Sequence, residues 1–267
     1  MQAPVQVGTA PLSRAYYEQY LTAQRTHWWF RGRERILQAL VRSVMGAQAG
    51  LRVADVGSGP GGPARKLFPA AWLAAFDLSL QPLSAYVEAD EHVAADATQM
   101  PCHARSFDVV CAFDVLEHLD EDRRALQEWR RILAPTGLLL LTVPAYRALW
   151  SAHDVANAHR RRYRLGPLRT LLGEAGFVIE RLTYFNTFLL PGVVLIRGLE
   201  RVWKRPCADH GETAYGELDF QERFPQWIER CCEAMLASEA GWLRSRSFPA
   251  GVSIGAIARV DERRVVT

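Results

Sequence analysis

A glycine-rich turn after a short apolar segment is the first place in the chain where the residue types suggest chemistry. Residues 51–56 are mostly apolar, and Gly57, Gly59 and Gly61 follow at alternate positions. Glycine lets the backbone bend tightly and approach a ligand with no side chain in between. Gly57, Gly59 and Gly62 also fit the G-x-G-x-x-G spacing of dinucleotide-binding folds. The turn therefore predicts a site for a nucleotide-containing cofactor.

A carboxylate follows at the position where such a cofactor needs one. Asp77 ends the second apolar segment, residues 71–76. Ligands of open α/β sheets bind outside the carboxyl ends of the strands, so we expect Asp77 to accept hydrogen bonds from both ribose hydroxyls of an adenosine. Nicotinamide dinucleotides and S-adenosylmethionine both contain this ribose. The turn and the acid alone leave both cofactors open.

These residues must be positioned by the short apolar segments that precede them. From residue 51 onward such segments alternate with helical patterns, and residues 107–113 form the nearly continuous apolar run typical of a strand buried on both faces. This alternation predicts a parallel sheet covered by helices on both sides. We expect strands at residues 51–56, 71–76, 91–95, 107–113, 138–143, 177–184 and 251–260, and helices at residues 31–45, 121–133 and 167–175.

The composition describes an ordinary globular protein with a mild charge. The formal net charge is +3 and the sequence pI is about 8.7. The basic residues form no long stripe interleaved with aromatics, so we expect no nucleic-acid partner. Any positive patch is therefore local, which suits a small anion.

The cysteines and the most apolar stretch bear on the location of the protein. The five cysteines include no CxxC pair and no His/Cys cluster with metal spacing, so we expect no metal ion and a reducing, cytoplasmic location. The stretch 188–196 is interrupted by Pro191 and Gly192 and is too short for a membrane span, which needs about 20 apolar residues. Burial is its default role, and the alternatives are a tunnel for an apolar ligand, together with Leu199, and contact at a membrane surface.

Three further segments distinguish between the two cofactors. Asp96 and Ala97 follow the third expected strand, where a short acidic turn can meet the exocyclic amine of adenine. Residues 107–119 contain a Phe-Asp-x-Val strand followed by Glu-His, and residues 133–144 contain Leu-x-Pro-x-Gly-x-Leu. With the glycine turn and the ribose acid, this order resembles the class I S-adenosylmethionine-dependent methyltransferases.

The resemblance extends beyond the cofactor half of the chain. Residues 27–33 read His-Trp-Trp-Phe-Arg-Gly-Arg, a segment that is similar to the N-terminal signature of a bacterial subgroup of these enzymes. Residues 144–154, 159–163 and 184–191 carry the same likeness. It covers roughly residues 16–260 and is thin between residues 200 and 248.

The resemblance implies an α/β fold with a Rossmann-like, doubly wound seven-stranded sheet whose last strand is antiparallel. N-terminal helices and a helical lid inserted between the last two strands would complete it. We accordingly expect four parts: an N-terminal helical lid (1–48), an S-adenosylmethionine-binding domain (49–187), a helical insertion over the acceptor site (188–248), and a final strand and tail (249–267).

The resemblance also assigns cofactor contacts. The glycines of the turn would line the methionine and ribose moieties, Asp55 would meet the amino acid end, and Asp77 would bind the ribose hydroxyls. The acidic turn at Asp96 would meet adenine, and Phe113 would flank the sulfonium end. The expected cofactor residues are Asp55, Gly57, Ser58, Gly59, Gly61, Asp77, Leu78, Asp96, Ala97, Phe113, Asp114 and His118.

Histidine is the side chain best suited to remove a proton from an acceptor near neutral pH. His153, on the loop after the fifth strand with Asp154 as its neighbour, is the general base we expect. His118 is the alternative, since it lies beside Glu117 and near the cofactor in any such fold, where a structural hydrogen bond is an equally good interpretation.

Other side chains are expected to contact the acceptor. Arg160–Arg162 with Tyr163 would clamp a phosphate or carboxylate, because guanidinium groups match those anions, unless they form a solvated turn. The aromatic residues 28–30 would either close over the site or pack into the core. The expected acceptor-binding residues are His27, Trp28, Arg31, Tyr146, His159, Arg161, Arg162, Tyr163 and Asn186.

The sequence therefore predicts transfer of a methyl group from S-adenosylmethionine to a small-molecule acceptor, at oxygen in preference to nitrogen or carbon, with S-adenosylhomocysteine as the product. The acceptor itself is left open; it is anionic or has an apolar portion. The alternatives are an NAD-dependent oxidoreductase, and a non-catalytic or non-methylating protein that uses the same cofactor pocket.

Overall fold

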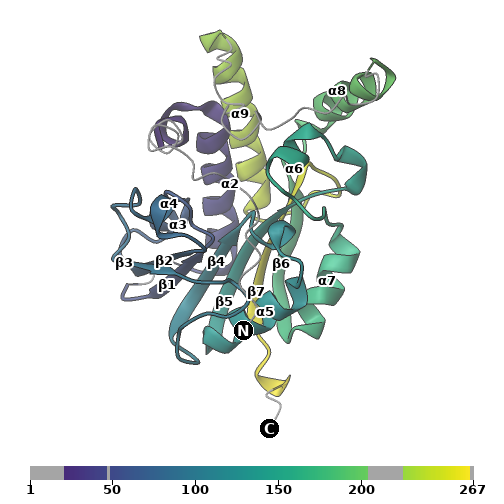
Figure 1. Ribbon diagram of the computed structural model, residues 1–267. Coiled ribbons are helices and arrows are strands. Elements are labelled where there is room, and N and C mark those ends of the chain that lie inside the picture. Colours follow the sequence, from purple (N-terminus) through teal and green to yellow (C-terminus); the bar gives the residue numbers. More distant parts are fainter. Residues whose placement is uncertain (1–20, 47–48, 204–224, 265–267) are drawn as a thin grey trace.

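A single seven-stranded sheet organises the chain, which is described here by a computed structural model over residues 21–46, 49–203 and 225–264 (Figure 1). The strand order is β3-β2-β1-β4-β5-β7-β6. The first five strands run parallel, and β7 lies antiparallel between β5 and β6. The strands are β1 (Arg52–Val56), β2 (Trp72–Asp77), β3 (Glu91–Ala94), β4 (Phe107–Phe113), β5 (Leu133–Pro144), β6 (Phe177–Phe185) and β7 (Ser253–Val260). The predicted doubly wound sheet with an antiparallel last strand is confirmed.

One strand begins earlier than the apolar pattern indicates. The sequence predicts the fifth strand from residue 138, whereas β5 begins at Leu133 because Leu133 pairs with Phe107 of β4. The register between the two strands then shifts, and regular pairing resumes at Val109 and Leu138. A polar interruption in sequence therefore marks an irregular pairing and not the start of the strand.

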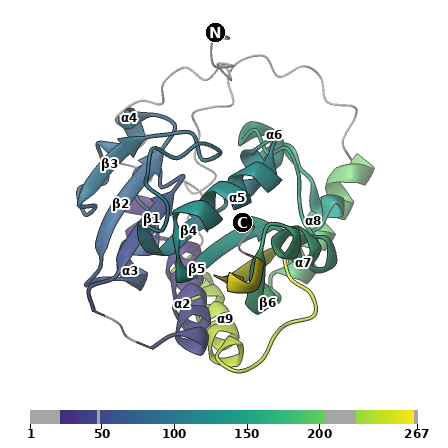
Figure 2. The same cartoon turned by 90° about the horizontal axis from the view of Figure 1, so that it is seen from below.

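Helices cover both faces of the sheet, as the alternation predicts (Figure 2). Alternate residues of the central strands supply each face, so Ala54 and Val110 belong to one core and Val53 and Val109 to the other. The first core receives α5 (Asp122–Ile132) and α7 (Leu165–Glu174); the second receives α2 (Trp28–Val44), α3 (Ala64–Leu67), α4 (Leu80–Leu83) and α9 (Gln226–Leu243).

The helices α2 and α9 lie side by side although about 200 residues separate them in the chain (Figures 1 and 2). Gly32 makes the contact close: a Cβ atom there would lie 2.3 Å from Leu236 Cδ1. Glu233 of α9 accepts ion pairs from Arg31 at 2.7 Å and Arg35 at 2.8 Å. Part of the expected insertion, α9, is thus built into the core through Leu236 and Leu243.

The other helix of the expected insertion, α8 (Leu190–Trp203), projects from the body of the molecule (Figure 1). Its exposed apolar residues include Val194, Leu195, Ile196 and Leu199, so the expected burial of the stretch 188–196 is wrong for this part of it. Within the described residues, no helix has both the length and the apolar content needed to cross a membrane.

The remaining short helices are η1 (Leu116–His118), η2 (Arg147–Leu149), α6 (Ala152–Ala156) and η3 (Glu262–Arg264). Residues 1–20, 47–48, 204–224 and 265–267, which belong to the expected lid, insertion and tail, lie outside the described part of the chain.

Candidate active site

The glycine-rich turn joins the carboxyl end of β1 to α3. Gly57, Gly59 and Gly61 have φ angles of 64°, 55° and 123°, a region that L side chains rarely adopt. Gly57 is also required by packing, since a Cβ atom there would lie 2.5 Å from a methyl group of Val115. The conformation therefore leaves the backbone of the turn bare toward the space above the sheet, as the sequence predicts.

Asp77, at the end of β2, is tied to this turn. Its Oδ2 accepts a hydrogen bond from the Gly59 backbone N–H at 3.0 Å, and its Oδ1 accepts from the Ser79 N–H at 3.4 Å. The backbone N–H of Ser58 donates to the Phe76 carbonyl at 3.0 Å. Burial raises the pKa of Asp77, and the Gly59 N–H acts in the opposite direction. The predicted ribose acid and the predicted turn thus form one unit.

Asp55 lies beneath the turn and is 2 % exposed. Its Oδ2 has no hydrogen-bond partner among the described residues. Burial raises the pKa of Asp55 to about 7; the neighbouring Tyr86 hydroxyl acts in the opposite direction, and the charge of Asp77 adds a smaller increase. A buried polar atom without a partner is costly, so Oδ2 is suited to accept a hydrogen bond from a bound ligand or water.

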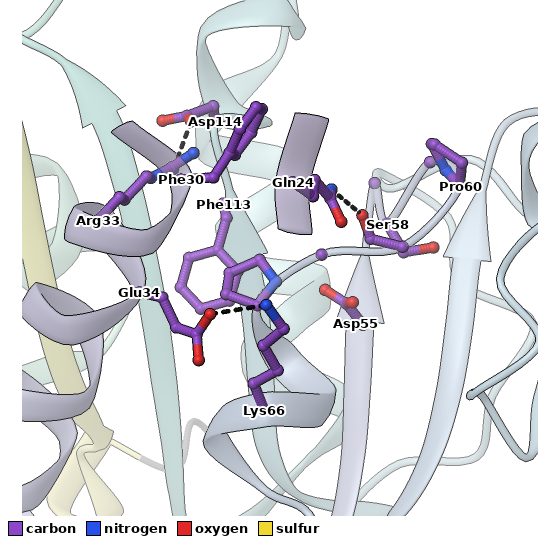
Figure 3. Close-up of a pocket in the computed structure, with 15 residues that line it drawn as sticks. Gln24, Phe30, Arg33, Glu34, Asp55, Ser58, Pro60, Lys66, Phe113 and Asp114 are labelled. Carbon is purple, nitrogen blue, oxygen red and sulfur yellow. Dashed lines mark hydrogen bonds and ion pairs between the residues drawn. The ribbon is translucent and has the colours of Figure 1, made fainter. Parts of the chain in front are cut away.

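A pocket opens between the turn and helix α2 (Figure 3). Gln24 donates a hydrogen bond to the Gly61 carbonyl at 2.5 Å, and Lys66 pairs with Glu34 at 2.7 Å. The site residues predicted from the sequence do not include Gln24, Lys66, Glu34 or Arg33. Phe30 was expected either to close over the site or to pack into the core, and it lines the pocket. The pocket is lined by Gln24, Phe30, Arg33, Glu34, Asp55, Lys66, Phe113, Asp114 and the turn residues 57–63.

Arg33 joins α2 to the ends of two strands. Its guanidinium forms an ion pair with Asp114, after β4, and donates to the Thr142 hydroxyl of β5 at 2.8 Å. The Thr142 hydroxyl donates in turn to Asp114 Oδ1 at 2.9 Å. Asp114 has a φ of 56°, and this closed network holds it in that unusual conformation at the edge of the pocket. Arg33 lies three residues after Phe30 on α2, so the two side chains share one face of the helix, and this spacing predicts that Arg33 points toward the same pocket as Phe30.

The adenine side of the expected site lies at β2 and β3. Leu78 is exposed, as suits a side chain that covers a ligand. Asp96 Oδ1 accepts from the backbone N–H and the hydroxyl of Thr98, each at 2.7 Å. The Ala97 carbonyl accepts from the Trp129 indole at 3.0 Å, which fixes the turn against α5. The structure thus brings Asp77, Leu78, Asp96 and Ala97 to the same edge of the sheet.

The aromatic segment at the start of α2 has several separate roles. His27 caps the helix, since its Nδ1 accepts from the Trp29 N–H at 3.2 Å. Trp28 packs into the core beneath the helix. Arg31 pairs with Glu233, and Phe30 alone of the three consecutive aromatics lines the pocket. Acceptor contacts by His27, Trp28 and Arg31 stay predictions.

The loop after β5 is held together by a buried carboxylate. Asp154 is fully buried and accepts from Arg162, at 2.7 and 2.9 Å, and from the backbone N–H of Ser151 at 2.8 Å. Asp154 Oδ1 also lies 2.9 Å from His159 Nδ1. Burial raises the pKa of Asp154, but the His159 and Arg162 hydrogen bonds outweigh it and hold the value well below its usual range. Asp154 is therefore a partner of His159 and Arg162, not of His153.

The three candidate histidines lie near one another but in different surroundings. The ring of His159 lies 4.8 Å from that of His118 and 6.2 Å from that of His153. His153, on α6, is exposed, and its neighbour is Asn157, whose side-chain amide donates to the His153 carbonyl at 2.8 Å. His118 is exposed as well; partial desolvation of its ring, together with His159, lowers the pKa of His118, so His118 is neutral at pH 7.

The remaining predicted acceptor residues make contacts within the protein. Arg161 pairs with Asp122 at 2.8 Å, and the Tyr163 hydroxyl donates to the same carboxylate at 3.1 Å. Tyr146 stacks on Tyr184 with ring centroids 5.0 Å apart. Asn186 is buried beside β7, where its amide donates to Ser253. Acceptor binding by Tyr146, Arg161, Arg162, Tyr163 and Asn186 stays a prediction.

Comparison with known proteins gives this site a context. Residues 54–141 match the family described as a methyltransferase domain. A probable S-adenosylmethionine-dependent methyltransferase of Mycobacterium tuberculosis is 33% identical over 90 residues, which cover 33% of each chain. A malonyl-[acyl-carrier protein] O-methyltransferase of Enterobacter lignolyticus is 33% identical over 127 residues, which cover 42% of this chain and 48% of the relative. The matches thus span less than half of each relative.

The fold has solved counterparts. One is a chain in the complex between the Haloferax volcanii Trm112 methyltransferase activator and a putative methyltransferase. It superimposes on this protein with a TM-score of 0.56 and 19% sequence identity, over 92% of this chain and 94% of that chain. At this level of identity the likeness concerns the fold alone. The cofactor edge at β1, β2 and β4 falls within the matched residues 54–141, whereas α2, α6 and α9 lie outside them.

Proposed function

We propose that this chain, whose residues 54–141 match a methyltransferase domain, transfers the methyl group of S-adenosylmethionine to an oxygen atom of a small-molecule acceptor. The observation that carries the proposal is the unit formed by the bare glycine turn and the carboxylate of Asp77. The name of the Enterobacter relative specifies an O-methyltransferase, which supports oxygen as the target.

The residues present fit the proposed cofactor. Asp77 can exchange its hydrogen bond from Gly59 for the two ribose hydroxyls, and Asp96 and Ala97 lie at the adenine side. At the other end, the unpartnered Oδ2 of Asp55 suits the amino group of the methionine moiety. Gln24 and Lys66 supply donors for its carboxylate. When bound, S-adenosylmethionine supplies an electrophilic methyl group on a sulfonium.

The tasks left to the protein are alignment, exclusion of water and removal of a proton. In the transfer, the carbon–sulfur bond breaks as a carbon–oxygen bond forms, and the hydroxyl proton of the acceptor passes to a base. Alignment alone contributes about 7–11 kcal/mol of barrier lowering in well-oriented systems. We propose His153 as the base, because it is exposed to solvent and because the lowered pKa of His118 makes that imidazole, which is also exposed, the weaker base. His118, neutral at pH 7, is the alternative.

Two features bear on the acceptor. The exposed apolar side chains of α8, with Phe188 before it, suit an acceptor with an apolar portion or one presented at a membrane surface. Arg161 and Arg162 would suit an anionic group only by exchanging their present ion pairs with Asp122 and Asp154. We therefore expect the apolar portion to dominate acceptor recognition.

Binding calorimetry and turnover test the proposal together. S-Adenosylmethionine and S-adenosylhomocysteine should bind at one site per chain, and NAD should not. Asp77→Asn should weaken both ligands, whereas Asp108→Asn, at the opposite edge of the sheet where it accepts from the Arg52 N–H, should not. Mass analysis of acceptors then identifies O-, N- or C-methyl products.

Each alternative function has its own outcome in these measurements. Binding of NAD in place of S-adenosylhomocysteine would indicate an oxidoreductase. Tight cofactor binding without methyl transfer to any acceptor would indicate a sensor or a non-methylating enzyme. His153→Asn that retains the full rate would remove His153 as the base without affecting the cofactor assignment.

A further inference from the structure

We propose that Glu117, His118 and His159 form a binding site for one divalent transition-metal ion. One ligand atom from each side chain lies within 4.8 Å of the others. Glu117 and His118 belong to η1, directly after β4, and His159 comes from the loop after β5. Two imidazoles with one carboxylate form a ligand set that binds Fe²⁺, Mn²⁺ or Zn²⁺ and leaves coordination positions open.

The strongest observation is the state of Glu117. Its side chain is fully buried, and neither carboxylate oxygen has a hydrogen-bond partner among the described residues. Native proteins rarely leave a buried carboxyl group in this condition, because the desolvation cost is not recovered. A metal ion beside the two histidines would satisfy both oxygens, which accounts for a feature that the cofactor pocket does not use.

The charged groups near Glu117 also favour a bound cation. Arg33 and Arg162 are the nearby cations, but Arg33 is paired with Asp114 and Arg162 with Asp154. Each of these two arginines thus already has its carboxylate, and Glu117 is left without a matching charge. A divalent cation between Glu117, His118 and His159 would supply it.

His159 has the outer partner that metal-binding histidines usually have. Its Nδ1 lies 2.9 Å from Asp154 Oδ1, which leaves Nε2 as its ligating nitrogen. A carboxylate that holds the other ring nitrogen fixes the tautomer and orientation of a ligating histidine. Asp154 is itself fixed by Arg162 and Ser151. The Arg160 N–H donates to the Glu117 carbonyl at 2.7 Å, so the loop that carries His159 is fastened onto η1.

The position of the site suggests its use. Phe113, the last residue of β4, and Asp114, which follows it, line the pocket and lie just before η1 in the chain. An acceptor oxygen bound at an open metal position would therefore be held near the cofactor edge of the sheet. This role rests on the proposed methyl transfer, whereas metal binding itself does not.

Calorimetry of chelator-treated full-length protein with Zn²⁺ and Mn²⁺ tests the site, with Mg²⁺ for comparison. We expect one transition-metal ion per chain, and Co²⁺ should give a d–d absorption spectrum. Glu117→Gln and His159→Gln should each abolish stoichiometric binding. Asp154→Asn should weaken it by about 10–100-fold, the usual effect of losing such an outer partner. His153→Gln, an exposed histidine on the same loop, is the matched control and should bind normally.

The outcomes separate this inference from the proposed function. Absence of binding by every tested ion, or equal loss in His153→Gln, would overturn the metal site. S-Adenosylhomocysteine binding, measured on the same samples without metal, reports on the cofactor site alone. If Glu117→Gln does not fold, His118→Gln decides the question, because His118 is the exposed member of the three ligands.

Discussion

Asp55 and Asp77 end neighbouring strands at the same edge of the sheet, yet their surroundings differ. Asp77 is hydrogen-bonded by the glycine turn, whereas Asp55 is almost fully buried and has an unpartnered Oδ2. The sequence predicts both carboxylates as cofactor ligands. Only the structure shows that Asp55 has a buried oxygen without a hydrogen-bond partner in the described part of the chain, which a bound ligand could supply.

The buried state of Asp55 predicts how stability depends on pH. Its folded pKa of about 7 lies above the usual aspartate value of 3.8, so between these two pH values the unfolded chain loses a proton that the folded chain keeps. The contribution of Asp55 to stability is thus highest below about pH 4 and falls as pH rises to about 7, by at most about 4 kcal/mol. Asp55→Asn should stabilise the ligand-free protein more at pH 8 than at pH 5. Urea unfolding at the two pH values measures this; an equal effect at both would contradict it.

Arg33 gives a second prediction at the scale of one side chain. Arg33→Gln should destabilise the protein by about 1–3 kcal/mol, because Asp114 and Thr142 would lose a largely buried charged partner. Arg35→Gln, which removes an exposed ion pair to Glu233 on the same helix, should cost less than about 1 kcal/mol. Denaturant unfolding of both variants makes the comparison. Equal costs would mean that the Arg33 network is not a special link between α2 and the strand ends.

At the scale of elements, the strand pattern was predictable because each strand is a short apolar run bounded by turn residues. The start of β5 was not predictable from the sequence, because the pairing of Leu133 with Phe107 depends on the neighbouring strand and not on local composition. The helical character of residues 226–243 was predictable, but its place beside α2 was not. That contact joins residues about 200 apart, and neither helix alone indicates its partner.

The α2–α9 contact predicts an unusual response to alanine. Alanine normally stabilises a helix relative to glycine by about 1 kcal/mol. At Gly32 the added Cβ would lie 2.3 Å from Leu236 Cδ1 and 2.7 Å from its Cβ, so Gly32→Ala should instead destabilise the protein by about 1–3 kcal/mol. Gly198→Ala on α8, with no atom within 4 Å, is the matched control and should be neutral or stabilising. Thermal melting that ranks the two variants in the opposite order would show that α2 and α9 do not pack closely.

At the scale of the whole molecule, the sequence was most informative where function depends on backbone and local order. The glycine turn, Asp77 and the Asp96 turn lie within 40 residues and meet because parallel strands share an edge. The approach of His159 to His118 was not predictable, since the path of the loop after β5 is set by the Asp154–Arg162 pair. The expectation of no metal ion rests on sequence spacing alone; the proposed site would depend on ligands that this loop brings together, and the expectation stays a prediction until metal binding is measured.

The pocket itself is a whole-molecule feature, because its walls come from the helix that contains Gln24, from α2, from the turn after β1 and from the end of β4. A ligand that contacts all of them should stabilise the fold as one unit. S-Adenosylhomocysteine at 100 times its dissociation constant should add about 2.7 kcal/mol, and thus raise the melting temperature by roughly 5–10 °C in a single transition. Gln24→Ala should need more ligand for the same shift, because the donor that it removes lies over the turn at Gly61. A second transition unaffected by the ligand would show that α2 unfolds independently of the sheet, and a shift with NAD in place of S-adenosylhomocysteine would contradict the cofactor assignment.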